Sequence, residues 1–524
     1  MERPHTPPRN QGAPWNSPTE AKVRASDCDD NDQCFEYPEL VFAFVAPLGV
    51  DLSITENAVA KRLEEIGYST ERIGISHDVL PQLDRVPQRE FANEYERIGT
   101  MMDIGTRARV KYGPDILAEG VASEIQKRRR GNKGRPRTAY LVHSLKHPEE
   151  VRRLRTIYPR GFYLFAVNVP PDARKKHLIG KSGMTQDRAE ELMRRDKLED
   201  EPNGQQVNQT FHMADFFVGW ARDIERVQSS VHRFVDIAFG APHRTPSFGE
   251  YAMYLAFAAS LRSADLSRQV GAVIARDGEI LSTGANDCPK AGGGLYWPFY
   301  DIEKKAFEDF PNGRDYMRGE DSNRKAQLQI IDDIITRFRG KRTPPNGLRK
   351  LKAILEDSAI GCLTEFGRVV HAEMEAILAC GRKSISARGA TLYCMTFPCH
   401  NCAKHIIAAG IKRVVFVEPY LKSKATNLHD EVIKIEYPEA SDSEDHVSAV
   451  VRFEPFFGVG PHRFYDLLFD EQRCRHSHSA QRQEEWESGK VDSTRREATC
   501  KNDSAVIPRR REVRRRHIFE CDKY

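Results

Sequence analysis

The 524-residue chain lacks a run of about 18 apolar residues, the length that a membrane-spanning helix requires. Its opening residues, Met1-Glu2-Arg3-Pro4, do not lead into the apolar core of a signal peptide. The 11 cysteines, two of them in a spacing typical of metal ligands, favour a reducing compartment over a disulfide framework. A net charge of +4 is too small to make the whole chain a nucleic-acid-binding polycation. These absences predict a cytoplasmic protein that does not enter a membrane.

A functional phosphate-binding loop is also lacking near the start of the chain. Leu40–Val45 is a short apolar run typical of a buried parallel strand, and a short loop joins it to an amphipathic helical pattern. Strand, loop and helix form the frame of a phosphate-binding loop, but Leu52 stands where the lysine belongs and Asp51 adds negative charge. Gly49 and Ser53 are the remaining candidates for contacts with a nucleotide.

Apolar runs alternate with helical patterns as far as residue 238, which predicts a parallel, doubly wound α/β domain over residues 38–238. Within it we expect further strands at residues 139–145, 162–169 and 211–217. A linker of glycine and proline residues follows, and a second domain is expected over residues 247–470. The chain on either side of this core, residues 1–37 and 471–524, is polar and is expected to form no packed core.

Two segments of the first domain, Asp103–Arg109 and Tyr112–Ala118, resemble the monophosphate-side helices of adenylate-kinase-like enzymes. The resemblance implies a P-loop nucleotide-kinase-like fold, although His143 stands where such kinases carry an acidic residue. Because phosphoryl transfer depends on positioned positive charge, we interpret the domain as a regulator that binds a nucleotide or RNA, and not as a kinase. A scaffold that binds nothing is the alternative.

The second domain contains His371-Ala372-Glu373 and, further on, Pro398-Cys399-His400-Asn401-Cys402. One imidazole and two thiolates would supply three ligands to Zn²⁺ and leave a fourth tetrahedral position open, as in catalytic sites. Both cysteines open a predicted helix, whose N-terminus favours thiolate. Glu373 lies close enough to the histidine to carry protons without binding the metal. The spacing H-x-E followed by P-C-x-x-C is the signature of zinc nucleobase deaminases. A structural zinc clip is the alternative.

The motif and three upstream segments, Ser260–Asp265, Gln269–Ile274 and Ser282–Pro289, resemble the cytidine and deoxycytidylate deaminase superfamily. The resemblance implies a cytidine-deaminase-like α/β/α domain, with zinc bound by His371, Cys399 and Cys402 and with Glu373 as the catalytic residue. The family reads Gly-Tyr-Asn-Gly where this chain reads Gly284-Ala285-Asn286-Asp287. Asn286 therefore carries over as a nucleoside contact, whereas the last glycine does not.

Three other side chains are candidates for substrate binding. Ala372 lies inside the motif, and Arg262 and Lys290 could hold the phosphate groups of a nucleotide. A solvated surface position is an equally good interpretation of either cation.

The order of the two domains resembles the bacterial antiphage cytidine-nucleotide deaminases, and local matches include Gly204–Gln206 and Leu363–Val370. This resemblance implies a homo-oligomer that deaminates dCMP or dCTP to deoxyuridine nucleotides and drains the cytosine deoxynucleotide pool during phage infection. The choice between the two substrates stays open at this point.

Two other functions compete with this one. A polynucleotide editing deaminase would act on tRNA or single-stranded DNA, and the arginine clusters at 128–130 and 509–516 would serve it. The first cluster can also be a solvated basic loop. A binding module with structural zinc would have no use for Glu373. The upstream match to deoxycytidylate deaminases favours a free-nucleotide deaminase.

Overall fold

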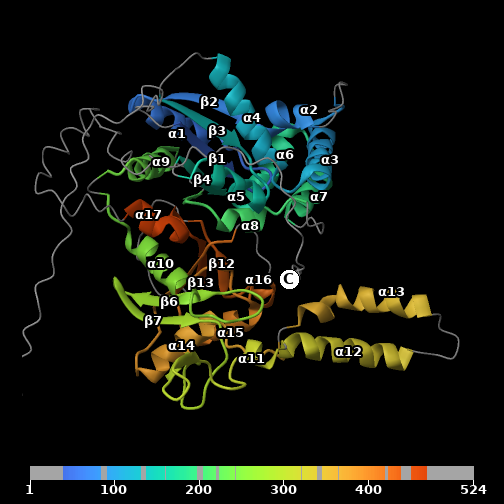
Figure 1. Cartoon of the computed structure of the whole chain (residues 1–524), viewed down its shortest axis with the longest axis vertical. Coiled ribbons are helices and arrows are strands. Elements are labelled where there is room, and N and C mark those ends of the chain that lie inside the picture. Colours follow the sequence, from blue (N-terminus) through green and yellow to red (C-terminus); the bar gives the residue numbers. More distant parts are fainter. Residues whose placement is uncertain are drawn as a thin grey trace, which may run out of the picture. The chain divides into compact units, whose positions relative to one another are not determined.

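The computed structural model of the chain describes residues 39–468, apart from 84–90, 132–136, 160, 198–203, 220–223, 242–243, 320, 339–344, 364, 419–422 and 438–449 (Figure 1). The predicted arm at residues 1–37, the tail at 471–524 and its arginine cluster lie outside the described residues. Among the helices that are described, none is long and apolar enough to cross a membrane.

The first of two six-stranded sheets has the strand order β14-β5-β4-β1-β3-β2. Strands β1 to β5 are parallel, and β14 joins the edge antiparallel to β5. The central strands consist of apolar residues that are buried throughout, as expected for a parallel sheet covered on both faces. The six strands are β1 (Leu40–Val45), β2 (Ser69–Gly74), β3 (Thr138–His143), β4 (Phe162–Asn168), β5 (Phe216–Gly219) and β14 (Gly458–Val459).

Helices cover both faces of this sheet, which confirms a doubly wound α/β arrangement for the first half (Figure 1). One face packs against α1 (Ser53–Glu65) and α9 (Ile224–Ala238). The opposite face packs against α3 (Glu94–Tyr112), α4 (Ile116–Gly131), α5 (Pro148–Ile157) and α8 (Val207–His212). The remaining helical segments of this half are η1 (Ile75–Val79), α2 (Leu80–Leu83), α6 (Pro171–Ser182) and α7 (Gln186–Lys197).

Two expectations about this half are wrong. The apolar run at 211–217 is not one strand. Phe211 lies in helix α8, which ends at His212, and β5 starts only at Phe216. The run is too short for the spacing of its apolar residues to distinguish a helix from a strand. The basic residues at 128–130 are not in a loop but in the last turn of α4, where Arg128 pairs with Glu124 and Arg129 with Glu39.

The second sheet has the strand order β12-β13-β11-β10-β6-β7. Strands β10 to β13 are parallel, β6 is antiparallel to β10, and β7 is antiparallel to β6. The turn between β6 and β7 is Asp277-Gly278, and both residues have positive φ, at 53° and 77°. The dipeptide Asp-Gly is typical of such two-residue hairpin turns, because both central residues need positive φ. The strands are β6 (Gly271–Arg276), β7 (Glu279–Ala285), β10 (Thr391–Cys394), β11 (Arg413–Phe416), β12 (Ile433–Ile435) and β13 (Val451–Pro455).

Helix α10 (Phe248–Ser260) packs on one face of the second sheet, and α14 (Ala372–Arg382) and α15 (His400–Ala408) pack on the other. The second half is therefore a mixed α/β/α arrangement, as expected. Three short helical segments follow along the chain: α16 (Ala425–Leu428), η3 (Pro461–Arg463) and α17 (Phe464–Leu468). Phe464 and Leu467 of α17 pack in the apolar cluster of the first sheet.

An insertion separates β7 from α14. It contains a two-stranded hairpin and a pair of helices, α12 and α13, that lie side by side (Figure 1). Its elements are β8 (Phe299–Asp301), β9 (Ala306–Glu308), α11 (Asp315–Arg318), α12 (Ser322–Phe338), α13 (Pro345–Glu356) and η2 (Ala359–Cys362).

The two sheets are joined by packing and by hydrogen bonds. One apolar cluster runs from β1 and β3 through α10 to β6, β10 and β11. Near the C-terminal end of the described chain, the N–H of Gly460 donates to the carbonyl of Asp215 at 2.7 Å, next to the β14–β5 pairing. The segment after β13 thus returns to the first sheet.

Candidate zinc and catalytic site

The two cysteines are positioned by the end of strand β10. After Cys394 the chain passes through Phe397 and turns at Pro398 into helix α15. Cys399 is the N-cap of this helix, and its Sγ accepts a hydrogen bond from the N–H of Cys402 at 3.4 Å. Cys402 is buried in the first turn. Both sulfur atoms therefore lie at the positive end of a helix, as the sequence predicts.

His371 is the N-cap of helix α14 and faces the cysteines from across the site. The start of the helix is fixed by close packing against β7. A Cβ atom on Gly284 would lie only 2.2 Å from the carbonyl oxygen of Ala372, so only glycine allows the strand to pass this closely. Ala372 itself is completely buried.

The three candidate ligand atoms form one cluster. His371 Nδ1 lies 3.3 Å from Cys399 Sγ and 3.4 Å from Cys402 Sγ. All three atoms lie within 4.8 Å of one another, and no other such group of metal-binding side chains occurs in the described part of the chain. Ligands about 2.0–2.3 Å from a tetrahedral zinc are roughly 3.5 Å apart, so this donor set fits Zn²⁺.

The electrostatics of the cluster also fit a cation. A side-chain hydrogen bond from Cys402 lowers the pKa of Cys399, whereas the same contact and burial raise the pKa of Cys402. The hydrogen bond with Cys399 raises the pKa of His371 to about 9. The cluster holds a thiolate and protons in a small buried volume, and a metal ion would take the place of those protons.

Glu373 lies in the first turn of α14 and is only 4% exposed. Burial is the main reason that its pKa is raised, and the negative charge of Cys399 adds to the effect. Its side chain also makes a hydrogen bond with Cys402. A buried carboxyl group beside the ligand set is suited to accept and release a proton.

The predicted substrate-binding residues differ in their burial and in their contacts. Asn286 is buried, and its side chain already bonds the backbone: it accepts from the N–H of Val270 at 2.6 Å and donates to Arg268 O at 2.8 Å. Arg262 lies over the ring of Trp297, 3.8 Å from the centroid. Lys290 is exposed. Their contacts with a substrate stay predictions.

The loop between β1 and α1 is occupied by the protein's own side chains. The N–H of Leu48 donates to Asp196 Oδ2 at 2.8 Å, and Lys146 Nζ donates to Asp196 Oδ1 at 2.9 Å. Ser53 Oγ donates to Asp51 at 2.6 Å. Gly49 has a φ of 89°, and a Cβ there would lie 2.8 Å from Arg174 O. The carboxylate of Asp196 thus occupies the N–H of Leu48, a backbone donor that a bound phosphate would use.

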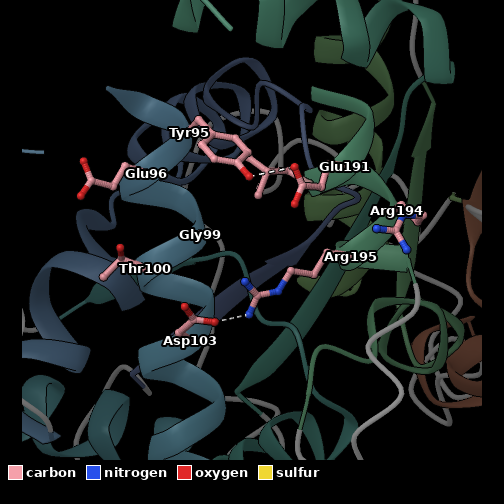
Figure 2. A pocket seen from close by; sticks show the side chains of 9 residues that line it. Tyr95, Glu96, Gly99, Thr100, Asp103, Glu191, Arg194 and Arg195 are labelled. Carbon is pink, nitrogen blue, oxygen red and sulfur yellow. Dashed lines mark hydrogen bonds and ion pairs between the residues drawn. The ribbon is translucent and has the colours of Figure 1, made fainter. Parts of the chain in front are cut away.

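A pocket of about 390 Å³ lies beside this loop, between helices α3 and α7 (Figure 2). Tyr95 donates to Glu191 at 2.8 Å on one side of it, and Arg195 donates to Asp103 at 2.5 Å on the other. Leu48 of the loop packs against the apolar cluster that contains Leu192, one of the residues that line the pocket. No local sequence pattern indicates this pocket, because its lining comes from two helices that are about 90 residues apart.

Two residues near the zinc ligands escaped the sequence reasoning. Glu418 is 4% exposed and accepts from the N–H of Phe397 at 3.0 Å, and its other oxygen lies 3.6 Å from His212 Nε2. Asp287 is 1% exposed and pairs with the residue before His371. The only sequence signal was that Asp287 replaces the family's glycine.

One imidazole, two thiols and a buried carboxyl on an α/β/α sheet define the class of zinc-dependent nucleobase deaminases. Residues 246–418 match the family described as cytidine and deoxycytidylate deaminase zinc-binding region, which confirms Zn²⁺ as the cofactor. The deoxycytidylate deaminase of Mus musculus is 30% identical over 179 residues, which cover 34% of this chain and 68% of the mouse protein. The chain belongs to the deoxycytidylate deaminase family.

Two other proteins are similar. The deoxycytidylate deaminase of Enterobacteria phage T4 is 29% identical over 172 residues, or 33% of this chain and 78% of the phage protein. The crystal structure of a dCMP deaminase from the cyanophage S-TIM5 in apo form is 18% identical, with a TM-score of 0.21, and the match covers 40% of this chain and 99% of that chain.

Proposed function

We propose that this protein deaminates dCMP, dCTP or both to the corresponding deoxyuridine nucleotides by hydrolysis. The observation that carries the proposal is the buried carboxyl of Glu373 beside the cluster of His371, Cys399 and Cys402. A purely structural zinc site gains nothing from a carboxyl group buried beside its ligands, whereas hydrolytic deamination needs a group that transfers protons. The similarity to proteins named deoxycytidylate deaminases supports a mononucleotide substrate.

Each residue of the site has a defined part in this reaction. His371, Cys399 and Cys402 would hold Zn²⁺, which as a Lewis acid makes water a better nucleophile at neutral pH. Glu373 takes a proton from the water that attacks C4 of cytosine and delivers protons to N3 and to the departing amino group. The C4–N bond breaks, ammonia leaves, and C4 keeps the oxygen. Burial around Glu373 keeps bulk water from competing for these protons.

The polynucleotide alternative has less support. Of the arginines at 128–130, Arg128 has ion pairs with Glu71, Asp78 and Glu124, and Arg129 is paired with Glu39. Arginines that are neutralised by carboxylates contribute little to phosphate binding. The cluster at 509–516 lies outside the described residues.

We further propose that the first domain binds a regulatory nucleotide without transferring phosphate. Asp196 and Lys146 already neutralise each other at the β1–α1 loop, and Leu52 supplies no charge there. The pocket between α3 and α7, with Arg194 and Arg195 in its lining, offers the space for such a ligand. Phosphoryl transfer from ATP to any deoxynucleoside monophosphate by the full chain would contradict the proposal.

The proposed biological role is depletion of the cytosine deoxynucleotide pool in defence against phage, by a cytoplasmic homo-oligomer. Its support is the order of the two halves, which resembles the antiphage deaminases. Expression of the wild-type chain should lower cellular dCTP and phage plaque counts, and expression of Glu373→Gln should lower neither. Equal protection by both chains would contradict a role for deamination.

The experiment for the proposed activity compares Glu373→Gln with Glu431→Gln, a change of an exposed carboxylate far from the ligand set in sequence. Purified proteins receive dCMP, and the deoxyuridine product and bound zinc are measured. Loss of a general acid–base group should lower the rate by about 10²–10⁴-fold in Glu373→Gln, with zinc retained. Wild-type turnover in Glu373→Gln would refute the mechanism.

A further inference from the structure

The loop after β7 is connected directly to the residue that precedes the histidine ligand. The N–H of Asp287 donates to Val370 O at 3.3 Å, and the N–H of Val370 donates to Asp287 O at 3.0 Å. His371 follows Val370 and starts helix α14 as its N-cap. The position of Asp287 in the fold therefore influences the position of His371 at the start of α14.

The side chain of Asp287 is held inside the protein. It is 1% exposed, its Oδ1 accepts from the N–H of Cys288 at 2.7 Å, and its Oδ2 lies 3.4 Å from Nε of Arg314. A buried carboxylate requires such compensation, because transfer of an unpaired charge from water into the interior is costly. Arg314 forms an ion pair with it, and the charge of Arg262 also acts on it.

Arg314 comes from the insertion, immediately before α11, and is only 6% exposed. Its Nη2 donates to Tyr296 O at 2.7 Å, and its Nη1 donates to Asp309 at 3.4 Å. One guanidinium thus donates hydrogen bonds to the Tyr296 carbonyl and to Asp309 and forms an ion pair, without a hydrogen bond, with the carboxylate of Asp287. Lysine has no planar fork and could not bind all three in this geometry.

The residues on either side of Arg314 are hydrogen-bonded to Arg368, which lies in the segment that leads to His371. Arg368 Nη1 donates to Asp315 at 2.6 Å, and its Nη2 donates to Gly313 O at 2.9 Å. The insertion and the residues before His371 are therefore linked twice, through Arg368 and through the Asp287–Arg314 pair. Arg262, a predicted phosphate contact, shares the Tyr296 carbonyl with Arg314 at 3.3 Å.

We propose that Arg314 is a positioning residue of the zinc site, which acts through Asp287 and the Val370 backbone to place His371. It touches neither a ligand atom nor Glu373, so its effect is transmitted entirely by the loop. Residues that orient metal ligands from outside the ligand set typically contribute about 10- to 100-fold to metal affinity or activity. The consequence for turnover rests on the proposed function, but the effect on zinc affinity does not.

The test compares Arg314→Met, Arg314→Lys, Asp287→Asn and the double variant Asp287→Asn/Arg314→Met with Arg318→Met. Arg318 is an exposed arginine at the end of α11, the short helix that Arg314 precedes, and its Nε donates to the Asn312 carbonyl at 3.0 Å. Zinc affinity is measured by chelator competition well below Tm, and Tm is measured separately. We expect Arg314→Met and Arg314→Lys to lower zinc affinity about 10- to 100-fold and Arg318→Met to leave it unchanged.

The double variant separates positioning from charge balance. Removal of both partners should recover part of the Tm lost in Arg314→Met, because Asp287 is no longer an unpaired buried charge, while zinc affinity stays low. This variant also decides the matter if Arg314→Met alone does not fold. Recovery of both Tm and zinc affinity in the double variant, or wild-type zinc affinity in Arg314→Met, would overturn the proposal. Absence of deaminase turnover in the wild-type chain would refute the proposed activity and leave the zinc result valid.

Discussion

The carboxyl ends of the parallel strands differ between the two sheets in how their charged groups are matched. At the first sheet, Lys146 pairs with Asp196, and Glu150 pairs with Arg109. At the second sheet, the buried Glu373 meets a cysteine and lies beside an imidazole and a second thiol. Matched pairs stabilise a fold, whereas a cluster of metal ligands beside a proton carrier is suited to a metal ion and a reaction.

The difference also separates two kinds of sequence evidence. The loop of the first sheet has the outline of a phosphate site, but its leucine and aspartate at positions 52 and 51 already indicated that the charge needed for catalysis is gone. In the second sheet every residue type that the chemistry requires is present at the required spacing. The strand–loop–helix frame of a phosphate site is therefore weaker evidence of activity than a complete set of reacting groups.

The largest effect should follow from removal of the two thiols. Cys399→Ala/Cys402→Ala takes away two of three ligands, so we expect near-complete loss of zinc and of deamination. Cys380→Ala is the matched control, because Cys380 is buried but bonds Ser282 and lies outside the ligand set. Metal analysis of both purified variants provides the measurement, and full zinc occupancy in the double variant would refute the ligand assignment.

The matched character of the first sheet can be tested with Lys146→Met. This change leaves Asp196 as a buried charge without its lysine, so we expect a loss of about 3–5 kcal/mol in the free energy of unfolding. Lys127→Met removes an exposed lysine whose partner, Glu124, keeps its ion pair with Arg128, and should cost at most about 1 kcal/mol. Denaturant unfolding measures both, and equal stability of the two variants would show that the pair does not hold the loop.

Glu418 connects the zinc loop to the first half of the chain, and its contribution should depend on pH. Burial opposes ionisation, but the contact with His212 is strong enough that the pKa is lowered from 4.5. A carboxylate with a depressed pKa stabilises the fold above pH 4.5, and the stabilisation is lost as pH falls through the folded-state pKa. Glu418→Gln should therefore cost about 1.5–3 kcal/mol at pH 7 and less in acid.

The measurement for Glu418 is denaturant unfolding of Glu418→Gln and wild type from pH 7 to pH 3, with Glu431→Gln as the exposed control. The difference between Glu418→Gln and wild type should shrink as the solution becomes more acidic. A difference that stays constant over this range would mean that the charge of Glu418 is not what stabilises the loop.

The smallest effect is expected for Arg262→Met, which removes a cation near the predicted phosphate position. Loss of one charged contact should raise KM for dCMP about tenfold, or about 1.4 kcal/mol, with less effect on kcat. Arg349→Met, at an exposed position of α13, is the control. An unchanged KM would assign Arg262 to the support of Trp297 and Tyr296 instead.

Local spacing made the zinc cluster predictable. His371 and both cysteines lie at helix starts that short segments of sequence specify, and the turn at Asp277-Gly278 is equally local. By contrast, β14 is a two-residue strand that returns to pair with β5 from more than 200 residues away, and no local pattern announces it. The same holds for Asp287 and Arg314, whose pairing depends on how the insertion folds.

The most direct test of the central claim is a substrate comparison with the purified wild-type chain. Equal concentrations of dCMP, dCTP and a single-stranded oligonucleotide that contains cytosine are incubated with it, and uracil products and ammonia are quantified. The account predicts deoxyuridine nucleotide and an equal amount of ammonia from dCMP, dCTP or both, and no product from the oligonucleotide. Deamination of the oligonucleotide alone would contradict it and would make this chain a polynucleotide editing enzyme.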